Sequence, residues 1–394
     1  MLFVSPYWPH KATCASELRS RHTALALMEM GSVDVVVVDA EGGGEEWETI
    51  SPKEFHVAGP VQVSNYPNTT IRRKLGWVLN PRSIYPHGCG VDGDAMTRVA
   101  RLAADYDLVW FFKLRTPNMF PTWAWPRSVV DIDDVPSTYE QSVWNSSVSI
   151  RDRLLAGVRL VNWIRRDRLL GERFSVLAVC SEADRAYLRR LGVTTPLHVI
   201  PNGYERPTVM PVWRPADPPR IGFIGIFDYQ PNREGVEWFV RHCWPLVKRA
   251  VPDARLRLAG RYSDGDLAPR GPDIDGLGWV ADSTSELLTW SAMIVPVQIG
   301  AGTRGKIAQA FSLKCPVVST PLGAHGYGVA NGRELFLAQS PEDFAAACVR
   351  VIRRKEEARE VAERAWQRFL TQWTWEAIKP RVWATAEDCL RLER

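Results

Sequence analysis

A glycine-rich segment with two basic residues carries the clearest chemical signal in the sequence. Residues 299–306 read IGAGTRGK and lie between a stretch expected to form a strand, 293–299, and one expected to form a helix, 306–313. Glycines let the backbone approach a ligand closely, and the amides at a helix start favour an anion. Arg304 and Lys306 add positive charge. We interpret the segment as a diphosphate-binding loop; the competing interpretation is a tight turn with solvated basic residues.

Two nucleotide-binding motifs match the same segment incompletely. Gly300, Gly302 and Gly305 fit the G-x-G-x-x-G dinucleotide fingerprint, but His325 stands about 20 positions on, where that pattern needs an acidic residue. The letters also fit a P-loop, except that Ile307 replaces the hydroxyl residue that would hold Mg²⁺. An oxidoreductase with a dinucleotide site at this loop stays an alternative, and it predicts tight binding of NAD.

Two α/β segments separated by a proline-rich stretch are expected to position this loop. Short apolar runs, typical of strands buried on both faces, alternate with helix-like stretches such as 15–30 and 234–250. The runs are 2–6, 33–40, 108–113, 128–135, 175–181 and 197–203, then 220–227, 255–260, 274–280, 293–299, 315–320 and 334–339. Residues 201–219 carry six prolines between the two sets. We predict two Rossmann-like α/β domains with a ligand cleft between them.

The composition excludes several classes of protein. The chain has 394 residues, and a formal net charge of +4 does not call for a nucleic-acid partner. Its seven cysteines never form CxxC, so no zinc or dithiol motif can be drawn, and we expect buried thiols in a reducing cytosol. The apolar run before Ser5 is too short for a signal peptide, and no charge-free apolar stretch reaches the length of a membrane span, about 18 residues. A cytoplasmic protein is expected.

Three stretches of the chain together resemble the retaining GT-B glycosyltransferases of family 4. They are VIPNG at 199–203, GFIGIFDYQPNREGVEWF at 222–239 and VPVQIGAGTRGKIAQAFSLKCPVVSTPLGAHGYG at 295–328. The resemblance implies a GT-B fold, in which a nucleoside-diphosphate sugar is held mainly by the C-terminal domain and the acceptor lies on the N-terminal domain. No single stretch is specific for the family, but the combination is.

The resemblance also implies a division of the chain. We expect a Rossmann-like acceptor domain over 1–202, a linker over 203–219 and a Rossmann-like donor domain over 220–375. Residues 376–394 are expected to form a C-terminal helix that crosses back to pack on the N-terminal domain.

Roles for residues of the glycine-rich loop follow from the resemblance. The amides of Gly302, Thr303 and Arg304 would hold the diphosphate next to Gly300, and Lys306 would supply charge. Arg304 and Lys306 are therefore the predicted catalytic residues, because they would stabilise negative charge on the leaving diphosphate.

Further donor contacts are expected from four other positions. Asp228 and Asn232 lie in the loop that follows 222–227, Val280 would meet the nucleobase through its backbone, and Ser16 belongs to the ATCAS stretch at 12–16. That stretch replaces a glycine-rich loop common in the family, yet it can still offer amides and a hydroxyl at a helix start. Ser16 and its neighbour Glu17 are also expected to form the cap region of that helix.

Two positions depart from the family pattern. Many members carry two glutamates, one touching the transferred sugar and one the ribose, where this chain has Ala301 and Gln309. Gln309 can still hydrogen-bond a ribose hydroxyl, whereas Ala301 offers the sugar no polar side chain. A non-catalytic nucleotide- or glycan-binding protein with the same fold is therefore the alternative function.

The resemblance implies reaction on one face of the donor, with the leaving diphosphate helping to deprotonate the acceptor. Arg304 and Lys306 would act in place of a metal, so neither a metal nor another cofactor is expected. Asp131-Ile132-Asp133 fits the letters of a metal-binding DxD motif but ends a buried-looking strand. Asp133 and Asp134 could bind an acceptor hydroxyl; the alternative is a helix cap or a salt-bridged corner.

Residues 151–173 contain seven arginines, three acids and interleaved apolar residues, which is typical of a helix that could touch anionic lipid or of an ordinary surface helix.

We therefore predict a cytoplasmic glycosyltransferase of hexosyltransferase type, located in part at the inner membrane face. It would move a sugar from a nucleoside-diphosphate sugar to a glycan, lipid-linked or small-molecule acceptor in polysaccharide biosynthesis, with retention. No nucleic-acid partner is expected.

Overall fold

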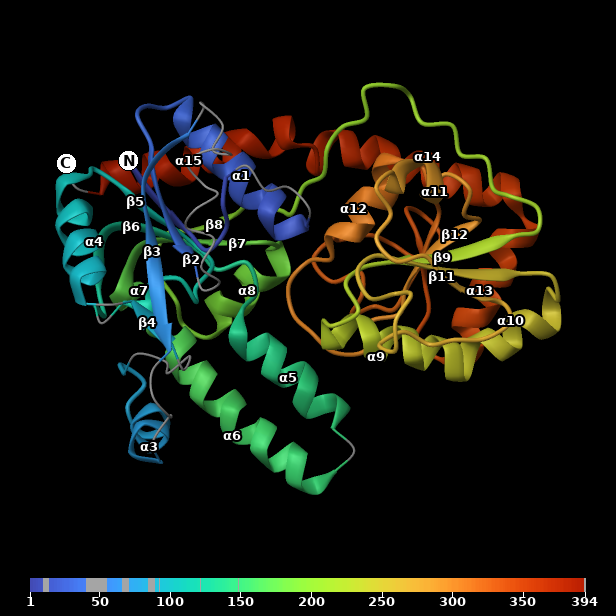
Figure 1. Ribbon diagram of the computed structural model, residues 1–394, viewed down its shortest axis with the longest axis horizontal. Helices are drawn as coiled ribbons and strands as arrows, with labels where there is room; N and C mark the ends of the chain where they lie inside the picture. The colour runs from blue at the N-terminus through green and yellow to red at the C-terminus, as the bar shows by residue number, and fades with distance from the viewer. Residues whose placement is uncertain are drawn as a thin grey trace. The chain divides into compact units, whose positions relative to one another are not determined.

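The computed structural model describes residues 1–9, 14–39, 55–65, 71–83, 89–91, 93–120, 122–147 and 149–392. They fall into two compact units, of which unit 1 contains Met1–Pro201 and Ile378–Arg394, and unit 2 contains Asn202–Ala377. Each unit holds one sheet with helices on both of its faces, as Figure 1 shows.

The sheet of unit 1 has eight strands in the order β4-β3-β2-β1-β5-β6-β7-β8. Its strands are β1 (Leu2–Ser5), β2 (Asp34–Asp39), β3 (His56–Asn65), β4 (Cys89–Val91), β5 (Val109–Phe112), β6 (Trp125–Asp131), β7 (Phe174–Val179) and β8 (Leu197–Val199). The edge pair β3 and β4 is antiparallel, and the other neighbours are parallel. Strands β1 and β5 are buried along their whole length, as expected for a sheet covered on both faces.

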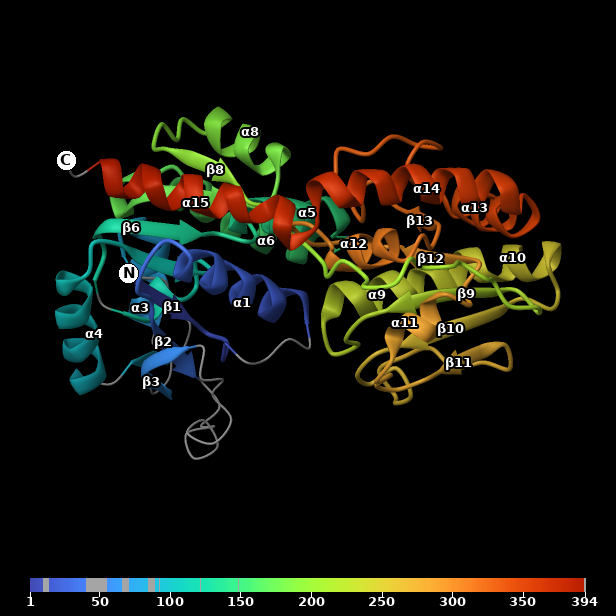
Figure 2. The same ribbon diagram turned by 90° about the horizontal axis from the view of Figure 1, so that it is seen from above.

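Helices cover both faces of this sheet because its strand order runs outward in two directions from β1. The helices are α1 (Ala15–Met28), α3 (Ile71–Leu79), α4 (Gly93–Asp105), α5 (Pro136–Ser146), α6 (Ile150–Asp167), α7 (Leu170–Arg173) and α8 (Glu182–Arg190), with a 3₁₀ turn at Pro117–Met119. Helix α15 (Trp375–Arg391) starts in unit 2, and its residues from Ile378 onward belong to unit 1. There it lies beside α1, where Trp383 Nε1 donates to the Ala26 carbonyl at 2.8 Å (Figure 2).

The sheet of unit 2 has six parallel strands in the order β11-β10-β9-β12-β13-β14. They are β9 (Arg220–Ile224), β10 (Arg255–Ala259), β11 (Ile274–Gly276), β12 (Ala292–Val295), β13 (Val317–Ser319) and β14 (Phe336–Leu337). The helices are α9 (Gln230–Trp238), α10 (Trp244–Ala250), α11 (Ser283–Leu287), α12 (Gly305–Ser312), α13 (Pro341–Arg353) and α14 (Lys355–Gln372). Figure 1 shows α9, α10 and α13 on one face and α12 and α14 on the other.

The core of unit 2 is divided by its sheet because successive strand residues point to opposite faces. Ala292 and Ile294 pack with Phe239 and Phe344 on the side of α10 and α13. Met293 and Val295 pack instead with residues of α12 and α14 such as Ile307 and Trp366. This second cluster fixes α12, and therefore the loop that precedes it.

The predicted α/β fold class is confirmed, and each predicted strand is present; the strands are mostly shorter than predicted, although β6, β7 and β12 begin earlier. Strands β3 and β4 were not predicted, because Gly59 and Pro60 interrupt the apolar pattern of β3. The helix predicted over 234–250 is interrupted by a π-helical turn, Phe239–Cys243, just before Pro245, which cannot donate a backbone hydrogen bond. None of the helices in the described part of the chain is long and apolar enough to cross a bilayer.

Candidate functional site

The glycine-rich loop follows β12 and leads directly into α12, at the carboxyl end of a parallel strand. Gly300 and Gly302 have φ values of +134° and +69°, a region that other residues rarely adopt. A Cβ atom on Gly300 would also lie 2.7 Å from Nη2 of Arg304. The loop conformation therefore requires glycine at these positions.

Asn202 holds the loop from the start of unit 2. Its side-chain nitrogen donates to Oγ1 of Thr303 at 2.8 Å and to the Thr303 carbonyl at 3.2 Å. The Tyr327 hydroxyl donates to the Arg304 carbonyl at 2.9 Å and accepts from the Ala308 amide at 3.2 Å. Residues from two of the sequence stretches quoted above, 199–203 and 295–328, thus meet at one turn, although the sequence alone did not indicate these contacts.

Arg304 is the N-cap residue of α12, and its guanidinium folds back over the loop. Nη1 donates to the carbonyls of Ala301 and Gly302, the latter at 2.6 Å. Nη2 is buried and has no hydrogen-bond partner in the described part of the chain. Among the described residues, the amides of Gly302, Thr303 and Arg304 donate no hydrogen bond either. Unpartnered donors of this kind, next to a positive charge, suit a multiply charged anion.

Lys306, in the first turn of α12, carries the second positive charge of the loop. Its ammonium donates to Oδ1 of Asn232 at 2.9 Å and lies 3.7 Å from the ring centre of Phe223. Burial, followed by the nearby charge of Arg304, lowers the pKa of Lys306 well below its usual value. No carboxylate pairs with this ammonium among the described residues, so an anionic ligand would relieve an unfavourable burial.

Gly225, at the end of β9, leaves the space between Lys306 and Asn232 open. A Cβ atom there would lie 2.8 Å from Nδ2 of Asn232 and 3.0 Å from Nζ of Lys306. Asn232 also donates to the Ile226 carbonyl at 2.9 Å, which fixes its side chain. Asp228 lies in the same turn and is exposed. The structure thus brings Asn232 to the glycine-rich loop but shows no such contact for Asp228.

Gln309 belongs to α12, and Val280 lies between β11 and α11. Gln309 is buried, and its side-chain nitrogen donates to Oγ of Ser283 at 3.1 Å. Val280 is half-buried next to the cluster that contains Ile307, while its neighbour Trp279 is 57% exposed. Neither residue forms a hydrogen bond with Arg304 or Lys306 in the described part of the chain.

The predicted acceptor residues Asp133 and Asp134 line a pocket of about 270 Å³ in unit 1, together with Lys113 and Arg115. Asp133 is paired with the Lys113 ammonium at 3.1 Å and accepts from the Cys180 thiol at 3.3 Å. Burial alone would raise the pKa of Asp133, but the charges of Lys113 and then Arg19 lower it to about 2. Asp133 and Lys113 have positive φ values, +60° and +65°, which is unusual for residues other than glycine.

Asp131 is not exposed to a ligand. Both of its carboxylate oxygens accept from Arg19, at 3.0 and 2.8 Å, and Arg19 also donates to the Ile200 carbonyl at 2.6 Å. Both side chains are fully buried. Burial would lower the pKa of Arg19, but the Asp131 carboxylate raises it above its usual value. The described residues hold no group of three or more His, Cys, Asp or Glu side chains that could bind a metal.

Ser16 lies in the first turn of α1, and the N-cap position belongs to Cys14. The helix begins at Ala15, as expected, but its N-cap lies two residues before Ser16, and the N-cap side chain makes no capping bond. Ala12 and Thr13 of the expected donor stretch lie outside the described residues.

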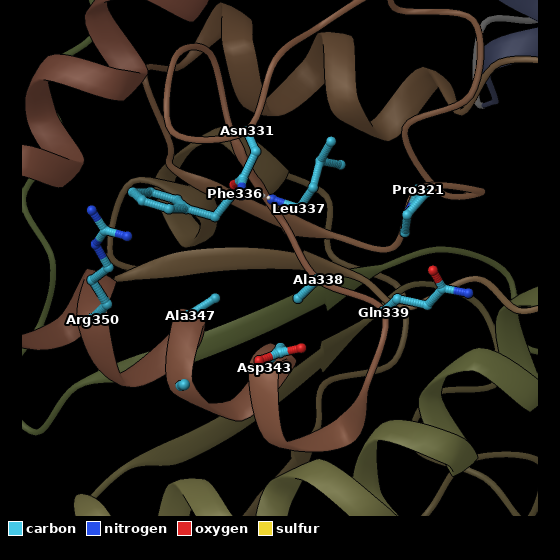
Figure 3. A pocket seen from close by; sticks show the side chains of 10 residues that line it. Pro321, Asn331, Phe336, Leu337, Ala338, Gln339, Asp343, Ala347 and Arg350 are labelled. Atoms are coloured by element: carbon cyan, nitrogen blue, oxygen red, sulfur yellow. Dashed lines mark hydrogen bonds between the residues drawn. The ribbon is translucent and has the colours of Figure 1, made fainter.

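A further pocket in unit 2, about 460 Å³ in volume, lies between β14 and α13 and is drawn in Figure 3. Its polar side chains serve local structure. Asn331 accepts from the Leu337 amide at 2.9 Å, Asp343 accepts from the hydroxyl of Ser340, the N-cap residue of α13, at 2.8 Å, and Arg350 pairs with Glu357. None of the predicted donor residues lines this pocket.

Comparisons with known proteins agree with this arrangement. Residues 218–354 match the family model of the glycosyl transferases group 1. The fold is similar to sucrose-phosphate synthase from Thermosynechococcus elongatus, with 15% identity, a TM-score of 0.69 and 99% of both chains covered. It is also similar to Anabaena Alr3699/HepE in complex with UDP and glucose, with 13% identity, a TM-score of 0.63 and 98% of both chains covered.

One curated relative is an "uncharacterized 44.6 kDa protein in cps region" from Klebsiella pneumoniae, 28% identical over 133 residues. That match covers 31% of this chain and 34% of the relative, so the chain spans about a third of the relative's length. The likeness to solved structures confirms the predicted GT-B fold, and the segment that matches the glycosyl transferases group 1 is residues 218–354. Unit 2 carries the group 1 domain.

Proposed function

We propose that the protein transfers a sugar from a nucleoside-diphosphate sugar to a glycan, lipid-linked or small-molecule acceptor, with retention of anomeric configuration. The observation that carries this proposal is the set of unpartnered donors at the glycine-rich loop. The amides of Gly302, Thr303 and Arg304, together with Nη2 of Arg304, point to an anion with several oxygens. The complex of HepE with UDP and glucose is a neighbour of the same fold and supports a nucleotide donor.

In this proposal the diphosphate lies on the glycine-rich loop, with Gly300 and Gly302 providing close backbone approach. The bond between the sugar carbon and the diphosphate oxygen breaks, and a bond from that carbon to the acceptor oxygen forms on the same face. The acceptor hydroxyl gives its proton to the departing diphosphate. Arg304 and Lys306 stabilise the negative charge that grows on the leaving group, so the transfer uses no metal or other cofactor.

The remaining predicted residues have secondary roles in the proposal. Asn232 positions Lys306 through their 2.9 Å hydrogen bond, and Gln309 presents its side chain to the ribose from its contact with Ser283. Val280 meets the nucleobase. Asp228 completes the donor site in unit 2.

The acceptor is proposed to lie in the pocket of unit 1. Asp133 is held in place by Lys113, and Asp134 is exposed beside it, so that Asp134 is the carboxylate placed to accept from an acceptor hydroxyl. We place the reaction on the cytoplasmic side of a membrane and in polysaccharide biosynthesis, which the location of the Klebsiella relative in a cps region supports.

Release of free nucleotide from a panel of nucleoside-diphosphate sugars tests the proposal. The wild-type protein should release one nucleotide slowly even without acceptor, and Arg304→Ala/Lys306→Ala should abolish the release. Arg249→Ala/Lys355→Ala removes two exposed basic residues of the same unit and is the matched control. No release with any donor, from a protein that still binds a nucleotide, would favour the non-catalytic binding protein instead.

A further inference from the structure

Helix α6 has the reverse of the usual polarity of a surface helix. Its buried residues include Asn162, Arg166 and Asp167, whereas five of its eight large apolar side chains are exposed. The exposed fractions are 80% for Ile150, 68% for Leu154, 50% for Leu155, 53% for Val158 and 57% for Val161. Ile150, Leu154, Val158 and Val161 follow each other at spacings of three or four residues and therefore form one stripe along the helix.

The buried polar residues fix this orientation. Arg166 donates to the carbonyls of Ser83 at 2.6 Å and Trp77 at 3.0 Å, which ties α6 to the C-terminal end of α3. Asp167 accepts from the Ser137 amide at 3.2 Å, at the start of α5. Rotating α6 to bury its apolar stripe would break these bonds and leave charged groups unpaired. The stripe is consequently a stable feature of the folded unit.

The apolar surface continues onto α3. Ile71, Leu75 and Leu79 are 78%, 54% and 71% exposed and are spaced four residues apart, so they share one face of that helix. Arg165 follows Val161 by four residues and donates to the Leu79 carbonyl at 3.3 Å, so the end of the α6 stripe adjoins α3. We call the eight exposed apolar residues of the two helices the apolar face: Ile71, Leu75, Leu79, Ile150, Leu154, Leu155, Val158 and Val161. They are half of the sixteen large hydrophobic residues that are exposed in the described part of the chain.

The exposed charges of α6 and its C-terminal end are almost all positive. Asp152 is the exposed acid of that helix. Five arginines of α6 and its end are exposed, namely Arg151, Arg153, Arg159, Arg165 and Arg168. One of them, Arg159, is neutralised by Glu140 at 2.9 Å. Apolar side chains next to guanidinium groups match an anionic lipid surface, where the apolar groups enter the acyl boundary and the cations meet phosphates.

We propose that the apolar face docks unit 1 on the surface of an anionic lipid bilayer, with α6 lying in the plane of the interface. The proposal concerns binding alone and does not depend on sugar transfer. In water this contiguous apolar area would stay exposed to solvent. Monomeric proteins usually avoid large exposed apolar areas. A bilayer covers it without any requirement for shape complementarity.

Flotation of the full chain with lipid vesicles tests this proposal. One set of vesicles contains equal parts of phosphatidylglycerol and phosphatidylcholine, and the other contains phosphatidylcholine alone. The triple variant Leu154→Gln/Val158→Gln/Val161→Gln removes the centre of the stripe. The matched control, Val209→Gln/Met210→Gln/Val212→Gln, changes three hydrophobic residues of unit 2 that are also more than half exposed. Because all six side chains are exposed, thermal unfolding should be unchanged in both variants.

We expect the wild-type protein and the control to float with the anionic vesicles and to bind neutral vesicles less well. The triple variant should lose about tenfold or more of its partitioning, since three apolar side chains no longer enter the bilayer. Equal flotation of the triple variant would overturn the proposal, and so would a wild-type protein that binds neither kind of vesicle. A wild-type dimer that becomes a monomer in the triple variant would also overturn it, because the face would then join two copies of the chain.

Discussion

The Lys306 ammonium donates to the side-chain oxygen of Asn232 at 2.9 Å and thereby joins two helix starts in unit 2. Asn232 lies at the beginning of α9 and Lys306 at the beginning of α12, which follow neighbouring strands of the sheet. The positive ends of two helix dipoles and one half-buried cation thus converge where parallel strands end. Such a place favours phosphate groups, and the first two predictions concern this lysine.

Replacing Lys306 by Met removes the charge and keeps the apolar stem. We expect the affinity for a nucleoside diphosphate to fall about 10- to 100-fold, since a charge-assisted hydrogen bond contributes about 1.5–3 kcal/mol. The melting temperature should stay equal or rise, because burial already disfavours the ammonium. Calorimetric titration and thermal unfolding measure both effects. Lys355→Met, at an exposed position, is the control; unchanged affinity in Lys306→Met would remove the lysine from the site.

The lowered pKa of Lys306 also predicts a dependence of nucleotide affinity on pH. A bound diphosphate favours the charged ammonium, so binding is tightest below the pKa of the free protein and weakens as the pH rises through it. Proton uptake on binding, measured by calorimetry in buffers of different ionisation enthalpy, should appear in the same range. Lys306→Arg stays charged throughout and should bind with a flat profile. A wild-type profile as flat as that of the arginine variant would contradict the explanation.

Asn202 should matter for nucleotide binding although it belongs to the segment just after β8. Asn202→Ala removes both hydrogen bonds to Thr303, so the glycine-rich loop loses its anchor. We expect nucleotide affinity to fall about two- to tenfold. Asn331→Ala removes a comparable side-chain hydrogen bond from another loop of unit 2 and should lower stability without changing affinity. Equal affinities for both variants would show that the anchor is dispensable.

The stability of unit 1 should depend on the protonation of Asp167. Burial raises its pKa from 3.8 to about 7, and Oδ1 has no partner in the described part of the chain. Between these two pH values the folded state binds a proton that the unfolded state does not, so stability falls as the pH rises from 3.8 to about 7. Asp167→Asn cannot ionise and should be more stable than wild type at pH 8, by roughly 1–4 kcal/mol.

Chemical denaturation of wild type and Asp167→Asn at several pH values measures this difference. The gain should vanish near pH 4, where both proteins are neutral at this position. Asp152→Asn, on the exposed part of α6, is the matched control and should show no such dependence. A gain that is the same at all pH values would mean that shape, and not charge, causes it.

Much of the fold could be predicted because its strands are buried on both faces. Runs such as VDVVVVDA at 33–40 have no amphipathic alternation, and this pattern together with intervening helices indicates a parallel sheet. The pattern fails at β3, where Gly59 and Pro60 interrupt the run. Edge pairing of β3 with β4 is decided by long-range contacts that no local signal carries.

Part of the candidate site could also be predicted, because glycines and cations at a strand-to-helix turn have a local physical meaning. The contact of Asn202 with Thr303 could not, since it joins residues 101 positions apart. The sequence left two interpretations of the acidic cluster at residues 131–134, an acceptor-binding site or a cap or salt-bridged corner. The choice between them depends on Lys113 and Arg19, which pair with Asp133 and Asp131. Only the folded chain shows which charges meet.

The central claim is that the glycine-rich loop binds a nucleoside diphosphate. A thermal-shift titration of the purified protein with UDP, GDP, dTDP, ADP and CMP, and with NAD as control, tests it most directly when repeated on Arg304→Ala/Lys306→Ala. We predict stabilisation of the wild-type protein by one nucleoside diphosphate, growing with the logarithm of its concentration, and none in the double variant. Equal stabilisation of both proteins, or a response of the wild type to NAD alone, would contradict the claim.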